Sequence, residues 1–190
     1  MTVMTTGLRV EMARYTAKEL LAADETRWRH TIGVAQRAEE IAATVAPEDR
    51  HTLVEAAWLH DVGYAASLVE TGFHSIDGAA YLERAGWPMR IAALVAHHSG
   101  AAIVAEFNGM RHALAVYPHL EGPLADALTY ADQTTGPLGQ RVDVRSRIDE
   151  VVRRHRPQSV QAKAYPVRAP YLLAIADRVE SRMRLADSQH

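Results

Sequence analysis

The residues most capable of chemistry in this chain are histidines and aspartates at the ends of apolar segments. His60 and Asp61 stand side by side after one such segment, and the other candidate ligands are His30, His74, His97, His98 and Asp132. Imidazole nitrogens and carboxylate oxygens bind divalent first-row metals, and the chain has no cysteine to compete with them. A carboxylate next to a ligating histidine has one oxygen for each of two ions. The pattern therefore predicts a site for divalent metal, with Asp61 as the candidate bridge.

One ion would take two histidines and two aspartates, namely His30, His60, Asp61 and Asp132. His74 together with His97 or His98 would complete a second site. Neighbouring helical residues point about 100° apart, so one of these two adjacent histidines would instead contact substrate or a carboxylate behind the ligands. The mixed donor set suits Fe, Mn, Co, Ni or Zn, and Mg where carboxylates dominate. Two such ions can lower the pKa of a shared water and clamp a phosphoryl oxygen.

The elements that position these residues are expected to be helices, because the apolar residues recur at steps of three and four along most of the chain. The expected helices are Arg9–Ala23, Glu25–Ala46, Pro47–Asp61, Gly78–Ala85, Pro88–His98, Ala101–Val116, Leu124–Ala131, Val142–Arg154 and Tyr171–Leu185. Asp24 is a candidate N-cap, Gly63 is expected to close the third helix, and Ser75 or Asp77 to cap the fourth. No strand alternation is present, so we predict an all-α fold. Residues 1–140 would form the metal-binding core and residues 141–190 a C-terminal helical extension.

Composition limits the partners. The 48% hydrophobic content supports a core, and a formal net charge of -2 argues against a general binder of nucleic-acid polymers. No apolar run approaches a membrane span, so we expect a soluble, cytoplasmic protein with no membrane partner. The apolar faces after residue 140 would either cover the core or form a homodimer, and periodicity does not choose between these.

Several segments in order resemble the HD superfamily of metal-dependent phosphohydrolases. They are Arg27-Trp28-Arg29-His30-Thr31, His60-Asp61-Val62-Gly63, His74-Ser75-Ile76-Asp77-Gly78-Ala79, His97-His98-Ser99-Gly100 and Tyr130-Ala131-Asp132. The resemblance covers roughly residues 20–136 and is nearest to binuclear members, in particular HD-type diadenosine tetraphosphate hydrolases. It implies an HD-domain helical bundle with extra C-terminal helices. The metal ligands that it implies are His30, His60, Asp61, His74, His97, His98 and Asp132.

The resemblance also implies a reaction, the hydrolysis of a small phosphoester or nucleotide by a metal-activated water. Asp61, Arg27 and Tyr64 would take part in catalysis, and the substrate would contact Arg27, Arg29, Tyr64 and Ser99. Many family members have a lysine where this chain has Tyr64, so Arg27 or Arg29 would bind the phosphate of the substrate instead. The alternative is that these two arginines only lie on a solvent-exposed helix face. Asp132 has a rival in Asp177, but charged neighbours make Asp177 typical of a solvated helix face.

Two other functions fit the same residues. HD-type mixed-valent di-iron oxygenases use a similar set of four histidines and two aspartates. Tyr64 in place of lysine, and an N-terminal helix carrying Tyr15, are compatible with that class, and iron is favoured for the second metal position. A non-catalytic nucleotide sensor is the third possibility, although the complete ligand set argues against it.

Overall fold

The computed structural model describes residues 2–148, 156 and 158–188 of the chain. Within these residues the only strand-like pairing is an isolated bridge between Thr135 and Arg141, so the predicted all-α class is confirmed. The helices are α1 (Thr2–Leu21), α2 (Glu25–Glu40), α3 (Arg50–Leu59), α4 (His74–Arg84), α5 (Met89–His97), α6 (Ala101–Asn108), α7 (Arg111–Leu114), α8 (Pro123–Gln133) and α10 (Val160–Asp187). Short 3-10 turns join them at η1 (Ala42–Thr44), η2 (Pro47–Asp49), η3 (Val62–Tyr64), η4 (Ala66–Leu68) and η5 (His98–Gly100).

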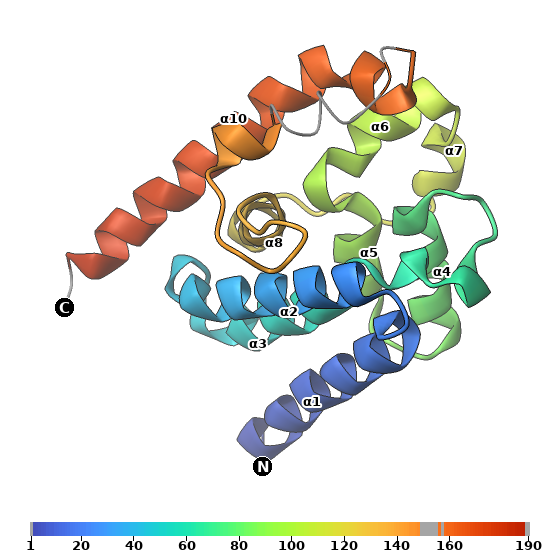
Figure 1. The fold of residues 1–190 in the computed structure, drawn as a ribbon. Helices are drawn as coiled ribbons and strands as arrows, with labels where there is room; N and C mark the ends of the chain where they lie inside the picture. Colours follow the sequence, from blue (N-terminus) through green and yellow to red (C-terminus); the bar gives the residue numbers. More distant parts are fainter. Residues whose placement is uncertain (1, 149–155, 157, 189–190) are drawn as a thin grey trace.

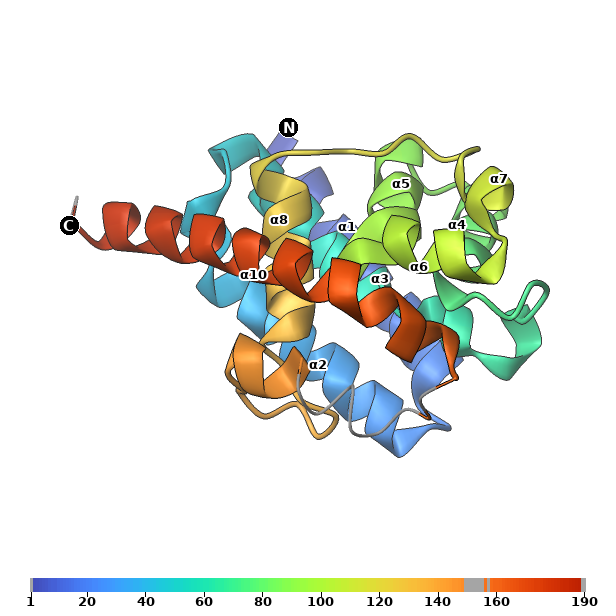
Figure 2. The ribbon, with the colours of Figure 1, turned by 90° about the horizontal axis from the view of Figure 1, so that it is seen from above.

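Helix α8 forms the centre of the molecule. Figure 1 shows it end-on, with α2 and α3 on one side, α5 and α6 on another and α10 crossing above. Ala127 and Ala131 on α8 are fully buried, and such small side chains let the surrounding helices approach closely. Figure 2 shows α10 crossing α8 at a steep angle, and α10 packs against both α8 and α6. The last turn of α8, where Asp132 lies, is therefore enclosed by helices from both halves of the chain.

The predicted cap at the start of α2 is confirmed. The side chain of Asp24 accepts a hydrogen bond of 2.9 Å from the backbone N–H of Arg27, which satisfies one of the free N–H groups of the first turn. The helix ends at Glu40 rather than continuing to Ala46, because the chain tightens into η1 after Ile41. Arg27 and His30 consequently lie in the first two turns of a well-fixed helix.

The predicted role of Gly63 is wrong. Helix α3 ends at Leu59, and Gly63 is not among the described residues with positive φ, so it does not close the helix in a left-handed conformation. Glycine is required there for space, since a Cβ would lie 2.0 Å from the carbonyl oxygen of His74 and 2.5 Å from the amide nitrogen of Gly78. This close approach brings the turn after Asp61 against the beginning of α4.

The predicted start of the fourth helix is also wrong. Helix α4 begins at His74, four residues before Gly78, and Phe73 occupies its N-cap position. Asp77 is 1% exposed and accepts hydrogen bonds from the backbone N–H groups of Thr71 (2.8 Å) and Gly72 (3.1 Å). Its carboxylate therefore holds the loop before the helix instead of capping a later one, and His74 becomes a first-turn residue.

Two further helices differ from expectation. The segment predicted as one helix from Ala101 to Val116 breaks at Gly109, whose φ of 74° ends α6 in the left-handed region. Helix α10 begins at Val160 instead of Tyr171 and continues past Pro166 and Pro170, each of which removes one backbone hydrogen bond.

The predicted helix Val142–Arg154 is described only in part. Residues 144–148 are helical, and the remainder lies outside the described residues. The division of the chain at residue 140 stays a prediction. Within the described part of the chain, no helix combines the length and apolar character that a membrane span requires.

Candidate metal centre

Six of the predicted ligands meet beside the last turn of α8. His30, His60 and Asp132, here called the first group, each offer one ligand atom, and these atoms lie within 4.8 Å of one another. Asp61, His74 and His98, the second group, meet the same condition. His30 comes from α2, and its Nε2 lies 3.0 Å from Oδ1 of Asp132, a residue 102 positions further along the chain.

The carboxylate of Asp61 lies between the two groups. Its Oδ2 is 3.3 Å from Nε2 of His60 and 3.8 Å from Nε2 of His30. Its Oδ1 is 3.6 Å from Nε2 of His74 and 3.8 Å from Nε2 of His98. Each oxygen of one carboxylate thus faces one group of histidines, the arrangement in which a carboxylate can bridge two cations.

Backbone carbonyl groups orient three of the imidazole rings. Nδ1 of His60 lies 2.8 Å from the carbonyl oxygen of Ala57, and Nδ1 of His98 lies 2.6 Å from that of Val95. Nδ1 of His30 contacts a backbone carbonyl at 3.1 Å. A carbonyl oxygen only accepts hydrogen bonds, so each Nδ1 carries the proton and each Nε2 directs a lone pair into the cluster. This is the orientation found in metal-ligating histidines.

The residues fit a bound cation. Nε2 of His60 is buried and, among the described residues, has no hydrogen-bond partner, although Oδ2 of Asp61 lies 3.3 Å away. Nε2 of His74 and Nε2 of His98 are only 3.4 Å apart, so two ring nitrogens point into the same space. An unsatisfied buried acceptor costs about 1–3 kcal/mol. A divalent ion in each group would satisfy these nitrogens together with the carboxylate oxygens.

The electrostatics keep His74, Asp61 and Asp132 in their metal-binding protonation states. Burial lowers the pKa of His74 to about 3, which leaves its imidazole neutral at physiological pH. Burial alone would raise the pKa of Asp61, but His60 and the Arg27 guanidinium hold it well below its usual range. Burial likewise opposes ionisation of Asp132, yet its close contact with the His30 imidazole holds its pKa well below the usual range. Both carboxylates are therefore ionised.

Arg27 and Tyr64 form a stack that ends on a ligand. Nη1 of Arg27 lies 2.5 Å from Oδ2 of Asp61, and the guanidinium carbon lies 3.8 Å from the centre of the Tyr64 ring. The Tyr64 ring stacks on His74 with 4.1 Å between ring centres. Partial burial and the carboxylate of Asp61 raise the pKa of Tyr64 to about 12, so its hydroxyl remains protonated at neutral pH.

Ser99 supports a ligand from the other side. It is the non-glycine residue with positive φ (53°) among the described residues, and this conformation turns its hydroxyl towards α8, where it donates to Oδ2 of Asp132. Nε2 of Gln133 donates to the same oxygen at 2.8 Å. The sequence suggested that Ser99 contacts substrate, which stays a prediction; in the structure its hydroxyl holds Asp132.

A cavity of about 160 Å³ lies beside the cluster. Its walls combine ligand atoms with cationic and polar side chains, and they include Arg27, Tyr64, His74, Ser99, Gln133, Arg147, Gln161 and Arg168. Arg147 and Arg168 were not singled out from the sequence, because they lie outside every recognisable motif and reach the cavity only through packing. A larger cavity of about 410 Å³ lies between α5, α8 and α10, and of the six clustered residues only His98 lines it.

The structure does not bring every candidate to the cluster. Nε2 of His97 donates to the carbonyl oxygen of Tyr117 at 2.9 Å, and its ring stacks on His119, so of the adjacent pair it is His98 that points inwards. The Arg29 side chain is 54% exposed and pairs with Glu25. Asp177, the rival of Asp132, is exposed on α10.

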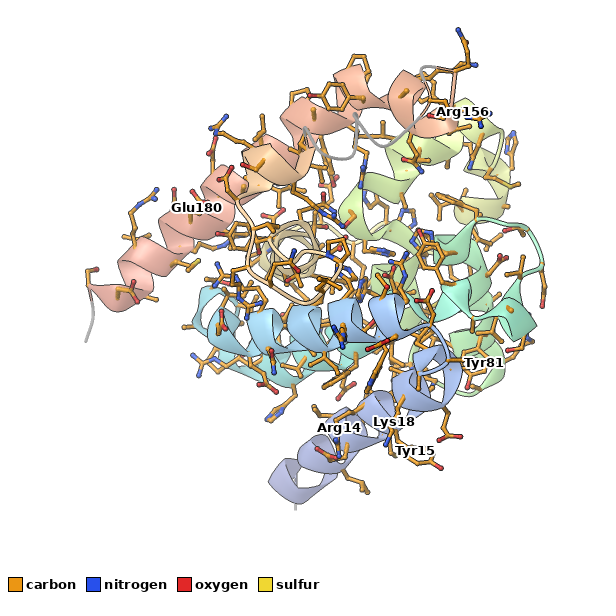
Figure 3. The ribbon with its side chains drawn as sticks, viewed as in Figure 1. Arg14, Tyr15, Lys18, Tyr81, Arg156 and Glu180 are labelled. Atoms are coloured by element: carbon orange, nitrogen blue, oxygen red, sulfur yellow. The ribbon has the colours of Figure 1, made fainter. Side chains whose placement is uncertain are left out.

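Tyr15 also lies away from the cluster. Figure 3 shows it with Arg14 and Lys18 on the outer side of α1, and the Tyr15 side chain is 66% exposed. It does not line the cavity beside the metal-binding residues.

An all-α bundle with a buried cluster of histidines and aspartates defines a helical metal-binding protein. The HD domain family model matches residues 27–182 of the 190, and the chain belongs to this family. HD domains bind divalent metals, and the family generally comprises metal-dependent hydrolases. No curated protein and no solved structure gives a significant match to the chain.

Proposed function

We propose that this chain is a metal-dependent phosphohydrolase that cleaves a small phosphoester or nucleotide at a binuclear site. Asp61 carries the proposal, because its two oxygens face two separate groups of ligands. Binuclear hydrolytic sites hold their ions about 3.5–4 Å apart, a spacing that one bridging carboxylate can span. Divalent ions in these positions would polarise a phosphoryl oxygen and lower the pKa of a water.

The proposed ligand assignment follows the two groups. His30, His60 and Asp132 would hold the first ion, His74 and His98 the second, and Asp61 both. Four imidazole nitrogens beside two carboxylates favour Fe, Mn, Co, Ni or Zn over Mg, which prefers oxygen donors.

Arg27 and Tyr64 would act on the phosphoryl group itself. The Arg27 guanidinium lies against Asp61 at the wall of the cavity, where its remaining N–H groups can meet phosphoryl oxygens as negative charge develops on them. Tyr64 holds the guanidinium by its ring face. Because the pKa of Tyr64 is raised to about 12, its hydroxyl can donate a hydrogen bond to an anion at neutral pH but cannot serve as a base.

The decisive experiment combines elemental analysis with phosphate release. Purified protein, reconstituted with Mn, Co, Ni, Zn or Mg, is tested on phosphomonoesters, mononucleotides and diadenosine tetraphosphate. We expect metal-dependent turnover, and loss of both bound metal and activity in Asp61→Ala. Asp177→Ala is the control, because it makes the same change at an exposed aspartate on α10. Turnover by a metal-free Asp61→Ala protein would rule out the mechanism.

The competing function is a mixed-valent di-iron oxygenase. It is supported by the same set of four histidines and two aspartates, and by Tyr64 at the position where many phosphohydrolases of the family have lysine. Tyr15 no longer adds support, since it is exposed and outside the cavity. An EPR spectrum of aerobically purified protein, with turnover measured under air and under nitrogen, separates the two functions. A mixed-valent iron signal with oxygen-dependent turnover would displace the hydrolase.

A further inference from the structure

Arg168 reaches the cavity beside the candidate ligands from α10, and among the described residues it has no ion-pair partner. Its Nε donates to the carbonyl oxygen of Ser99 at 2.8 Å, and within the described residues neither Nη nitrogen has a hydrogen-bond or carboxylate partner. Two other arginines of α10, Arg178 and Arg182, do have an ion-pair partner, since both bind Asp126. Arg168 is thus a partly buried cation whose outer N–H groups are available on the wall of the cavity.

Arginine side chains line the cavity. Arg27 contributes one guanidinium, which pairs with Asp61, and Arg168 contributes another, which has no carboxylate partner among the described residues. Burial lowers the pKa of Arg168, which reflects the cost of removing this charge from water without a partner. An anionic ligand beside it would offset that cost.

The position of Arg168 relative to the ligands is fixed through one residue. The carbonyl oxygen of Ser99 accepts from Arg168, while the hydroxyl of Ser99 donates to Asp132 in the first group. Arg27 approaches from α2 and Arg168 from α10, helices that lie on opposite sides of α8 (Figure 1). A group bound in the cavity would therefore meet guanidinium groups that come from two sides of α8.

We propose that Arg168 binds the anionic oxygens of the substrate, so that α10 supplies one wall of the substrate site. The identity of that anion as a phosphoryl group rests on the proposed phosphohydrolase function. A guanidinium presents a planar fork of N–H donors that matches two phosphoryl oxygens. The cavity of about 160 Å³ is smaller than the roughly 300 Å³ at which pockets for drug-sized ligands begin, so it encloses the phosphoryl group while the rest of the substrate extends outwards.

The test measures binding of inorganic phosphate to the Mn-loaded protein, residues 1–190, by isothermal titration calorimetry. Losing a charged hydrogen-bonding partner should weaken phosphate binding by about 10- to 100-fold in Arg168→Gln. Arg168→Lys should recover part of the loss, because the charge remains while the fork is gone. Arg184→Gln, the same change at an exposed position of the same helix, should bind phosphate as the unmodified protein does.

Metal content and turnover separate the possible explanations. Unchanged phosphate affinity in Arg168→Gln would overturn the proposal. So would a loss of bound metal in both Arg168 variants, since Arg168 would then act by holding Ser99 and Asp132. For p-nitrophenyl phosphate we expect the KM to rise more than kcat falls. Phosphate binding that depends on Arg168, without hydrolysis of any ester, would support the role of Arg168 and contradict the proposed phosphohydrolase function. Hydrolysis by Arg168→Gln with unchanged KM and phosphate affinity would support the phosphohydrolase function and contradict the role of Arg168.

A measurement on the unmodified protein covers the case in which Arg168→Gln does not fold. Phenylglyoxal modifies accessible arginines, and mass spectrometry locates the modified sites. Saturating phosphate should protect Arg168 but not Arg184. Equal modification of Arg168 with and without phosphate would contradict the proposal.

Discussion

Gly63 and Gly78 lie in backbone contact across the turn that follows Asp61. A Cβ on Gly63 would approach the amide nitrogen of Gly78 to 2.5 Å and the carbonyl oxygen of His74 to 2.0 Å. His60 and Asp61 immediately precede this contact, and His74 starts the helix on its other side. The absence of two side chains thus sets the spacing between the first and second groups of candidate ligands.

Replacing Gly63 with alanine should therefore damage both stability and metal binding. The new Cβ would meet backbone atoms, which cannot move aside as a flexible side chain can, and overpacking of this kind costs about 1–3 kcal/mol. Urea unfolding gives the free energy of unfolding, and elemental analysis gives the metal content. Gly7→Ala is the control, because no atom lies within 4 Å of its Cβ position on α1, and it should stabilise by about 0.5–1 kcal/mol. Wild-type stability and metal content in Gly63→Ala would show that the contact is dispensable.

The adjacent residues His97 and His98 provide a matched pair of substitutions. His98→Ala should lower the number of bound ions per chain, because Nε2 of His98 points into the second group. His97→Ala should leave the metal content unchanged, because its ring is bonded to Tyr117 and stacked on His119. Elemental analysis of the two variants in parallel decides the matter. Equal losses in both would mean that His97 also ligates.

Removal of metal should lower thermal stability. The buried Nε2 of His60 and the ionised carboxylates of Asp61 and Asp132 would be left without a cation, whereas bound metal stabilises the folded state by mass action. At a free metal concentration of 100 times Kd this amounts to about 2.7 kcal/mol. Thermal unfolding with chelator, and again after metal is restored, measures the change. Asp61→Ala should show little response to chelator, and a full response in that variant would contradict the assignment.

Asp126 joins α8 to α10 and should make stability depend on pH. Partial burial raises the pKa of Asp126, but hydrogen bonds from Arg178 and Arg182 outweigh this and lower it. A lowered folded-state pKa gives stability that is present above the ordinary aspartate pKa and is lost as the pH falls through the lowered value. Asp126→Asn should therefore lose about 1–2 kcal/mol at pH 7, and the difference should narrow in acid.

Unfolding of Asp126→Asn by urea at pH 7 and pH 3 tests this dependence. Asp177→Asn serves as the control on the exposed face of α10, where a substitution should change stability by less than about 0.5 kcal/mol. A difference between the Asp126 variant and the wild type that grows in acid would have the wrong sign for this ion pair.

Local sequence determined the elements. Helix period predicted the helical class, Asp24 predicted the start of α2, and the His60-Asp61 doublet with its neighbouring histidines pointed to the HD family. Helix period and the Asp24 cap depend on residues a few positions apart, which interact within one helix or turn, and the family motifs are short segments read in order along the chain. For the same reason the prediction failed where distant backbone mattered. The sequence placed Gly63 at a helix end, because its contact with α4 cannot be recognised from the residues next to it in the chain.

Tertiary packing alone decided how the candidate residues meet. The sequence left His97 and His98 open, and the turn at Ser99 directs His98 inwards while His97 bonds to Tyr117. It could not connect Arg168 with the metal site, because α10 reaches that site only by crossing α8 and α6. The period of the apolar residues predicts which face of a helix is buried. Which faces then oppose one another depends on how the helices pack, and that is set by contacts between residues many positions apart.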